Sequence, residues 1–416
     1  MERSETEQRL YAQIAATRED QEFIAAIRGL DNALDLGITE DGDPGGIHAI
    51  EVLTGAPGSE RLIISAPAIV WENVMSACPP VGQHSLTAAL RSGAVKITGE
   101  ALHIAQSLHA LERLFEILRG QRDEGVDEPS LQSISGHYAV LTMPDGERIQ
   151  VFTEESGKRD GPVLLMLHTA GADARQYHAL MANESLQSDW RLVAFDMPGH
   201  GRSMPRQGHA WRPHVLTKAD YLGICQAFIT QYLRRKIVIL GCSMGAAMAL
   251  KLAKEFPEEV LAAVALEAPW KAKGRRSPML CHAQVNQVAH NAAYVRGLMS
   301  PISPLALRRR AAWIYGQGGF DIYGGDLIFY SDDFDAEADL VGLSGENRII
   351  TLLTGAYDYS ASPTDSGKVS AVIPGSRLIV MQDLGHFPMV ENPSRLLDYL
   401  LPELDLIRRM VSSNAH

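Results

Sequence analysis

Six short, nearly continuous apolar runs lie in the last two thirds of the chain: PVLLMLH, WRLVAFD, KIVILGC, VLAAVALEA, NRIITLLTG and SRLIVMQD. Most of them alternate with helix-like segments. An uninterrupted apolar run is typical of a strand buried on both faces, and alternation with helices is typical of a parallel sheet. Before these runs, residues 137–155 predict a hairpin that turns at Pro144-Asp145-Gly146. We therefore predict an α/β domain over residues 131–416, with its active groups in loops at the carboxyl ends of strands.

The first 120 residues mix strand-like and helix-like segments instead. Residues 60–75 predict a strand followed by a helix, residues 92–100 predict a further strand, and residues 101–120 have apolar positions at helical spacing. This pattern predicts a smaller α+β domain over residues 1–120. The next segment is polar, is rich in Gly, Asp, Glu and Pro and has no apolar periodicity, so we predict a linker at residues 121–130.

Length, composition and charge indicate a globular protein and argue against several other classes. A chain of 416 residues is too long for one ordinary domain, and 46% hydrophobic with 21% charged residues is typical of a globular protein. The net charge of −12 argues against a nucleic-acid partner. No apolar stretch reaches about 18 residues, so no membrane span is predicted. The charged amino terminus lacks the apolar segment of a secretory signal, and we expect a cytoplasmic protein. Four scattered cysteines without a CxxC pair argue against a zinc site or a disulfide framework.

A Gly-x-Ser-x-Gly segment centred on Ser243 joins the apolar run KIVIL to the helix-like run AAMALKLAKEF. A turn this sharp admits only very small residues two positions before and after the serine, and both of these positions, Gly241 and Gly245, are glycine. Such a turn projects the hydroxyl above the sheet and leaves N–H groups at the helix start unpaired. In the alternative interpretation, Ser243 only caps the helix. The strand–turn–helix context favours a nucleophile.

A histidine and a carboxylate follow the last two predicted strands. Serine needs a base near neutral pH, and His386, after the run SRLIVMQ, can supply one. Asp358 follows the preceding strand and is our choice for the acid that orients His386. Glu267, which follows an earlier strand, is the alternative acid. Asp383, three residues before the histidine, is interpreted as a turn residue.

Two further segments, LLMLHTAGADARQY and AFDMPGHGRSMP, complete a resemblance to a known family. Residues 136–405 resemble the α/β-hydrolase superfamily. The resemblance implies a mostly parallel central sheet, helices on both faces, a helical cap, and a catalytic triad of Ser243, Asp358 and His386. In this family His200 belongs to a structural turn; it is our second choice for the base.

The same resemblance implies an oxyanion hole. The loop after the first of the six runs supplies one N–H donor, which by position is Ala170, and Met244 supplies the other. Thr169 stands where the family usually has glycine, and its hydroxyl either adds a donor or fills space. His168 is interpreted as structural. Acyl-enzyme hydrolysis with no cofactor and no metal follows from these roles.

About 75 residues separate LEAPW from NRIITLLTG, where a short connection is usual in an α/β unit. In this family such an insertion is commonly a cap, and we predict one at about residues 270–345. Trp270, Trp313 and Tyr315 are candidate substrate contacts, together with Thr169. The alternative is that the aromatic residues form the cap's own core. The run Arg308-Arg309-Arg310 either binds a substrate carboxylate or forms a solvated helix face.

Three functions are compatible with these observations. The leading one is a serine hydrolase that cleaves a carboxylic ester or lactone of a small hydrophobic compound, including aromatic ones. The second uses the same triad on an amide or on a carbon–carbon bond, as in a ring-cleavage product or a β-diketone. The third, from another class, is a non-catalytic ligand-binding or receptor protein. The intact triad argues against the third.

A second resemblance concerns the amino-terminal region. The order ISAP–x–VW, RSGAVKITGE and an apolar helix, over roughly residues 60–120, is similar to the carboxy-terminal half of sterol-carrier-protein-2-like domains. That family has an apolar lipid pocket, but the strands that would precede this segment are shortened here. We favour an accessory domain that packs against the second domain or against a second subunit, as in a homodimer.

Overall fold

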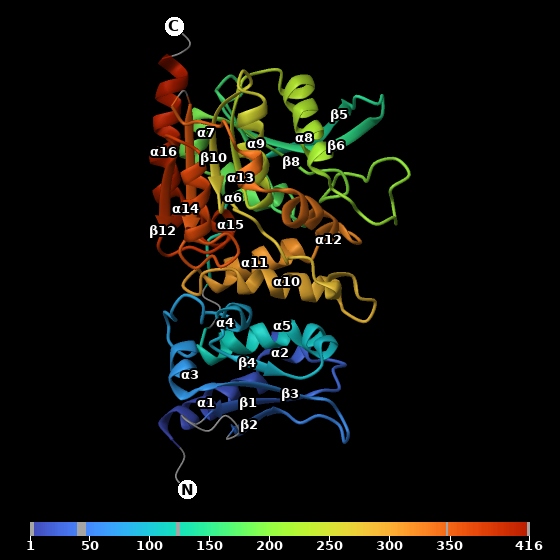
Figure 1. The fold of residues 1–416 in the computed structure, drawn as a ribbon, viewed down its shortest axis with the longest axis vertical. Coiled ribbons are helices and arrows are strands. Elements are labelled where there is room, and N and C mark those ends of the chain that lie inside the picture. Colours follow the sequence, from blue (N-terminus) through green and yellow to red (C-terminus); the bar gives the residue numbers. More distant parts are fainter. Residues whose placement is uncertain (1–3, 40–46, 122–124, 347, 414–416) are drawn as a thin grey trace. The chain divides into compact units, whose positions relative to one another are not determined.

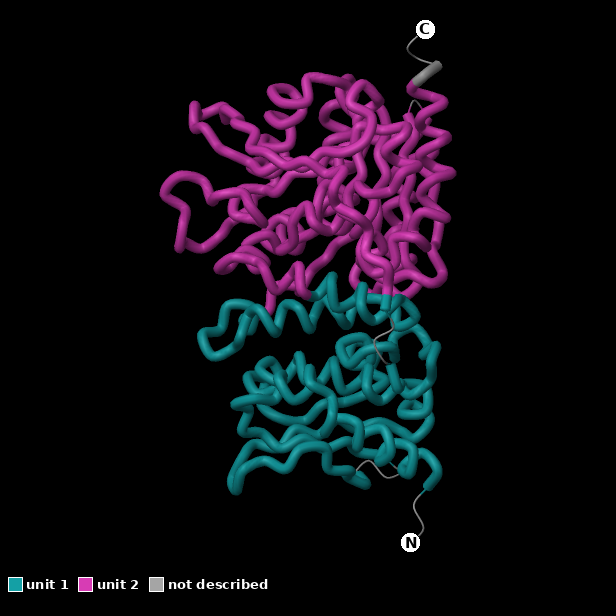
Figure 2. The backbone as a smooth tube through the Cα atoms, turned by 180° about the vertical axis from the view of Figure 1, so that it is seen from behind, with its two compact units in different colours: residues 1–125, 278–312 teal, residues 126–277, 313–416 magenta. Residues whose placement is uncertain are grey.

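The computed structural model describes residues 4–39, 47–121, 125–346 and 348–413. The chain divides into two compact units, shown in Figure 2. Unit 1 comprises Met1–Gly125 and Pro278–Ala312, and unit 2 comprises Val126–Ser277 and Trp313–His416. The predicted cap at residues 270–345 is thus divided between the two units. The predicted linker includes residues 122–124, which lie outside the described residues.

Unit 1 contains a four-stranded sheet in the order β2-β1-β3-β4 (Figure 1). Strand β1 pairs in parallel with β3 and antiparallel with β2, and β4 pairs antiparallel with β3. The predicted strand, helix, strand and long helix of residues 60–120 are present as β3, α3, β4 and α5. The elements are β1 (Ala33–Thr39), β2 (Ile47–Leu53), β3 (Arg61–Pro67), β4 (Lys96–Thr98), α1 (Glu5–Ala15), α2 (Gln21–Ala26), α3 (Ala68–Val74), α4 (Leu86–Ser92), α5 (Ala101–Leu118) and α10 (Gln287–Gly297).

The core of unit 1 forms around helix α5. Leu111, Leu114 and Phe115 of this helix are fully buried, and the ring of Phe115 lies 6.2 Å from that of Trp71 on α3. Ala293 of α10 belongs to the same apolar cluster, although it lies far along the chain. Helix α10 therefore contributes to the hydrophobic core of unit 1, and burial of its apolar side stabilises that core.

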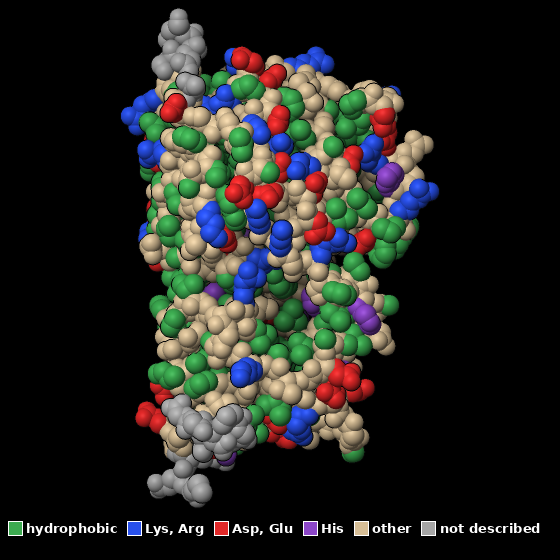
Figure 3. All heavy atoms as spheres, viewed as in Figure 1, with side chains coloured by type: hydrophobic (Ala, Val, Ile, Leu, Met, Phe, Trp, Pro, Cys, Tyr) green, Lys and Arg blue, Asp and Glu red, His purple; other side chains and the backbone are tan. Residues whose placement is uncertain are grey.

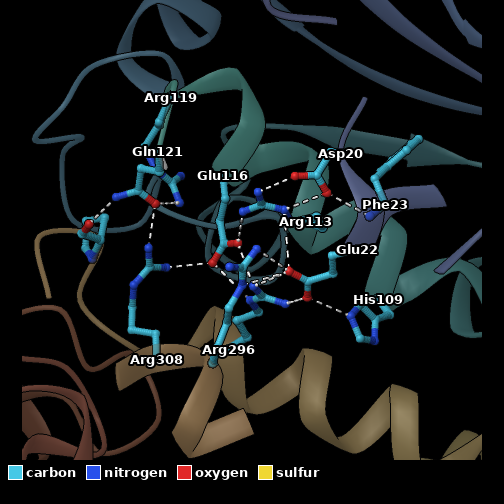
Figure 4. A network of polar contacts seen from close by, with 12 residues as sticks. Asp20, Glu22, Phe23, His109, Arg113, Glu116, Arg119, Gln121, Arg296 and Arg308 are labelled. Atoms are coloured by element: carbon cyan, nitrogen blue, oxygen red, sulfur yellow. Dashed lines mark hydrogen bonds and ion pairs between the residues drawn. The ribbon is translucent and has the colours of Figure 1, made fainter. Parts of the chain in front are cut away.

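Another face of α5 carries charged residues that are also buried (Figure 4). The Glu116 carboxylate accepts hydrogen bonds from Arg113 (2.9 Å), from Arg296 of α10 (3.0 Å) and from Arg308 (2.7 Å). Arg296 also binds Glu22 of α2. Burial alone would raise the pKa of Glu116, but the surrounding guanidinium groups lower it to about 2. The ion pairs fix residues 278–312 within unit 1.

This arrangement bears on one of the two interpretations of the arginine run. Arg308 is buried and binds Glu116, and Arg309 binds Glu22. The alternative of a solvated helix face is therefore wrong for Arg308. Its partner lies 192 residues away in the sequence, so no local pattern indicated the contact.

Unit 2 contains an eight-stranded sheet in the order β12-β11-β10-β9-β7-β8-β6-β5. The six apolar runs form parallel strands, and the predicted hairpin forms the antiparallel pair β5 and β6 at one edge. The predicted α/β architecture is confirmed. The strands are β5 (Ser135–Thr142), β6 (Arg148–Gly157), β7 (Val163–Leu167), β8 (Arg191–Phe195), β9 (Ile237–Cys242), β10 (Val260–Leu266), β11 (Ile349–Gly355) and β12 (Arg377–Met381).

Helices pack against this sheet, and strands such as β7 and β9 are therefore buried along their whole length. Helix α9 contacts β9, β10 and β7, and α14 contacts β11 and β12. No helix within the described ranges has both the length and the apolar character that crossing a membrane requires. The helices are α6 (His178–Met181), α7 (Glu184–Asp189), α8 (Lys218–Ala227), α9 (Met244–Glu255), α11 (Leu305–Tyr315, which begins in unit 1), α12 (Ile322–Leu327), α13 (Ala336–Asp339), α14 (Pro363–Val372), α15 (Pro388–Glu391) and α16 (Pro393–Ser413).

Candidate active site

Ser243 occupies the turn between β9 and α9. Its backbone has φ 55° and ψ −113°, a strained conformation for a residue with a side chain. A Cβ atom at Gly241 would overlap the backbone of Gly245, and one at Gly245 would overlap the carbonyl oxygen of Leu167. Both glycines are therefore sterically required. The Ser243 side chain forms no capping hydrogen bond with α9, so the interpretation of Ser243 as a helix cap is wrong.

The three predicted residues Ser243, His386 and Asp358 are brought together at the carboxyl ends of β9, β12 and β11. His386 Nε2 lies 2.9 Å from Ser243 Oγ, and His386 Nδ1 lies 2.6 Å from Asp358 Oδ2. All three side chains are buried. An imidazole held in this way can accept the hydroxyl proton of Ser243 on one nitrogen while the carboxylate fixes the proton on the other.

Asp358 is held in its charged form. Its second oxygen, Oδ1, accepts hydrogen bonds from the N–H groups of Ser360 (2.6 Å) and Ala361 (3.1 Å). Burial would raise the pKa of Asp358, but the charge of His386 and its hydrogen bond outweigh burial and lower the pKa below its usual value. The carboxylate is therefore ionised at neutral pH.

Glu267, the alternative acid, follows β10 and lies beside Asp358. Its backbone also has a positive φ, 55°, and its carboxyl oxygens accept hydrogen bonds from Gly355 N–H at 2.9 and 3.0 Å. Burial, and then the adjacent charge of Asp358, raise the pKa of Glu267 well above its usual value. Glu267 is therefore a neutral carboxylic acid that shares a hydrogen bond with Asp358. Asp358 therefore contacts His386 directly, and Glu267 contacts Asp358.

The loop that carries His386 is fixed on two sides. The Glu391 carboxylate accepts hydrogen bonds from Gly385 N–H (3.0 Å) and Phe387 N–H (3.1 Å). The thiol of Cys242 lies 3.3 Å from the carbonyl oxygen of His386 and donates to it. Glu391 was missed from the sequence, where an acidic residue before Asn-Pro gave no distinguishing signal.

The predicted oxyanion donors are the N–H groups of Ala170, in the loop after β7, and of Met244, which directly follows Ser243 in the chain. Within the described residues, neither Ala170 N–H nor Met244 N–H donates a hydrogen bond, so both are available to an acceptor. The loop of Ala170 is held by Thr169, whose hydroxyl contacts Tyr315 and lies 3.1 Å from Gln176 Oε1. The buried side chain of Thr169 therefore holds the loop in place through these two contacts.

Gly171, the next residue of this loop, donates its N–H to Asp326 Oδ2 at 2.8 Å. The same carboxylate lies 2.8 Å from His200 Nε2 and 2.9 Å from His214 Nε2. These residues could form a metal-ligand set, but each nitrogen is already at hydrogen-bond distance from Asp326. His200 contacts Asp326 and not Ser243, so the second-choice base does not lie in the triad.

The remaining predicted substrate contacts lie in different surroundings. Tyr315 is buried, with its ring 5.4 Å from that of Phe387 beside the triad histidine. Trp313 is 56% exposed and stacks on Arg175, and Trp270 is half-buried. Tyr330 was not chosen from the sequence. Its buried hydroxyl has no hydrogen-bond partner among the described residues, and it lies near enough to Ser243 and Ser360 for them to affect its pKa, which burial raises to about 12.

Comparison with known proteins bears mainly on the fold of unit 2, and the matched range also includes residues 278–309 of unit 1. Residues 162–309 match the family model described as alpha/beta hydrolase fold. A thermophilic esterase from Thermogutta terrifontis is 19% identical with a TM-score of 0.53, and covers 65% of this chain and 99% of its own. The enol-lactonase from Burkholderia xenovorans is 15% identical with a TM-score of 0.55, and covers 65% and 100%. These similarities show that the chain has the α/β-hydrolase fold.

Among curated proteins, a 105-residue segment is 32% identical to the magnesium-chelatase 30 kDa subunit of Rhodobacter capsulatus. That match covers 25% of this chain and 34% of the relative, so the chain spans about a third of that relative's length. Residues 60–120 lie outside the family-model match. Their similarity to sterol-carrier-protein-2-like domains stays a prediction.

Proposed function

We propose that this chain, which has the α/β-hydrolase fold, is a serine hydrolase that cleaves a carboxylic ester or lactone of a small hydrophobic compound, including aromatic ones. The observation that carries the proposal is the continuous line of contacts from Asp358 through His386 to Ser243, at 2.6 and 2.9 Å. Each group has the chemistry that acyl transfer requires in that position.

The reaction would proceed in two halves. His386 accepts the proton of Ser243 as Oγ attacks the substrate carbonyl carbon, and the carbonyl oxygen becomes an oxyanion between the N–H groups of Ala170 and Met244. His386 then gives the proton to the leaving alcohol, and an acyl ester on Ser243 remains. In the second half, His386 takes a proton from water, the resulting hydroxide attacks the acyl carbon, and the acid is released as Ser243 recovers its proton.

Aromatic side chains near the triad support the substrate class. Tyr315 and Phe387 pack against each other, and the Phe387 ring lies 4.7 Å from the His386 ring. Apolar and aromatic walls with a few polar groups are typical of small-molecule sites. An esterase and an enol-lactonase have the same fold, so esters and lactones are the first substrates to test.

Labelling with a fluorophosphonate probe tests the nucleophile. We expect wild type to be labelled and Ser243→Ala not to be labelled, since the probe reacts only with an activated serine. Ser188→Ala, an exposed serine on the same unit, is the matched control and should label like wild type. Equal labelling of wild type and Ser243→Ala would exclude the proposed nucleophile. Esters, lactones, amides and β-diketones assayed against both proteins then identify the bond.

A further inference from the structure

Unit 2 contains a cavity whose lining does not include the triad residues. Its volume is about 660 Å³, within the range of small-molecule sites. Most of its lining comes from residues 197–200, 204–206 and 209–216, together with Gly319, Phe320 and Ile322. Ser243, Asp358 and His386 do not line it. The cavity is therefore a candidate site separate from the reacting groups.

Two exposed aromatic rings form part of the wall. Trp211 and Phe320 have ring centroids 5.8 Å apart, with 38° between their planes. Trp211 is 86% exposed and has a φ of 62°, a backbone conformation that a bulky residue adopts only at an energetic cost. Packing does not compensate this cost, because the indole is not buried. Because strained backbone is found preferentially at functional sites, an exposed aromatic ring on such backbone beside a cavity is a candidate ligand contact.

The cavity also carries uncompensated positive charge. Among the described residues, the side chains of Arg212 and His209 have no ion pair or hydrogen bond, although both line the cavity. By contrast, Arg206 binds Glu147, and the one acidic lining residue, Asp220, contacts Arg206 and Thr217. Figure 3 shows basic, histidine and hydrophobic side chains close together at this edge of unit 2. A free guanidinium favours a carboxylate, which it can bind with two parallel hydrogen bonds.

We propose that this cavity binds an aromatic carboxylate. The planar ring of the ligand packs against Trp211 and Phe320, and its carboxylate binds Arg212 beside His209. The apolar part of the lining excludes a highly charged ligand, and the free cation selects a carboxylate over a neutral ring of the same size.

The cavity is connected to the loop beside the triad. His214 lines the cavity, and its Nε2 lies 2.9 Å from Asp326 Oδ1. The other oxygen of Asp326 accepts the N–H of Gly171, next to Ala170. A ligand that moves the His214 ring therefore acts on a group that holds this loop. This consequence rests on the proposed function, whereas the binding site does not.

Binding of 1-naphthoate, measured by calorimetry, tests the site without reference to catalysis. We expect the acid to bind wild type and Ser243→Ala alike, and Phe320→Ala to weaken binding at least about tenfold. Arg212→Gln should weaken binding of 1-naphthoate by a similar factor but leave binding of the neutral 1-naphthalenemethanol unchanged. Arg159→Gln, an exposed arginine elsewhere on unit 2, is the matched control and should bind like wild type. Phe320, Arg212 and Arg159 are exposed, so folding should be preserved when they are replaced, and Ser243→Ala removes only one oxygen from a buried side chain.

Two results would overturn the proposal. One is equal affinity of 1-naphthoate for wild type, Phe320→Ala and Arg212→Gln. The other is complete loss of binding after Ser243 has reacted with a fluorophosphonate, which would place the acid in the triad site. Because binding is measured with the inactive Ser243→Ala variant, failure of this site and failure of the hydrolase proposal give different results.

Discussion

The carboxyl group of Glu267 lies beside that of Asp358, and the two buried acids hold opposite protonation states. Asp358 is ionised because its pKa is lowered by His386, and Glu267 is neutral because burial and Asp358 raise its pKa. A neutral acid behind the triad carboxylate can donate a hydrogen bond to it without adding a second charge.

Replacing each of the two acids by its amide, in separate variants, distinguishes the role of Asp358 from that of Glu267. We expect Asp358→Asn to lower kcat by about four orders of magnitude, because the amide cannot hold His386 in the required tautomer. Glu267→Gln should keep most of the activity, since the amide also offers an N–H to Asp358. Steady-state kinetics on an ester that wild type hydrolyses would measure both. A loss in Glu267→Gln as large as that in Asp358→Asn would identify Glu267 as the charged partner.

Tyr330→Phe is expected to lower kcat/KM by about one order of magnitude without loss of stability. Its buried hydroxyl has no partner among the described residues, so its removal relieves an unsatisfied group, while a substrate near Ser243 loses a donor. Tyr221→Phe is the matched control, because the Tyr221 hydroxyl is also buried without a partner. We expect this control to keep wild-type kinetics. Unchanged kcat/KM in Tyr330→Phe would exclude contact with the substrate.

The triad could be predicted from sequence because parallel strands bring their carboxyl ends to one edge of a sheet. The order of Ser243, Asp358 and His386 after successive strands was therefore sufficient. Glu391 and Asp326 could not be found in the same way. Glu391 accepts backbone N–H groups, and a backbone donor leaves no trace in the sequence. Asp326 accepts one such group and contacts two histidines more than 100 residues away, which no local pattern connects to it. The burial of Arg308 could not be predicted either, because its partner Glu116 lies in a distant segment of the chain.

The buried charges of unit 1 predict a dependence of stability on pH. The pKa of Glu116 is lowered from 4.5 to about 2, so its ionised form stabilises the folded state above about pH 4.5. This contribution, about 3 kcal/mol, is lost as the pH falls from 4.5 towards 2. Denaturant titrations at pH 7 and pH 3 should show Glu116→Gln destabilised at pH 7, with a smaller difference from wild type at pH 3.

Glu258→Gln removes an exposed acid and is the control for this comparison. It should unfold like wild type at both pH values. A deficit in Glu116→Gln that stays constant from pH 7 to pH 3 would show that the carboxylate charge does not provide the stabilisation.

Removal of Met1–Gly125 should cause aggregation. The shortened chain would expose the apolar side of α10 and leave Arg296 and Arg308 without their carboxylates. A chain that also lacks Pro278–Ala312, with a Gly-Ser linker in its place, should be more soluble because both parts of unit 1 are absent. Light scattering and circular dichroism would compare the two. A folded, monodisperse product of the first deletion would contradict the assignment of α10 to unit 1.

The division of unit 1 between two chain segments also orders events during synthesis. Its first 125 residues leave the ribosome early, but Arg296 and Arg308 follow Glu116 by 180 and 192 residues. Until they emerge, the acidic groups of α2 and α5 have no guanidinium partners from that segment. Unit 1 can therefore be completed only after the chain between its two segments, which includes the central strands β7, β9 and β10 of unit 2, has been made.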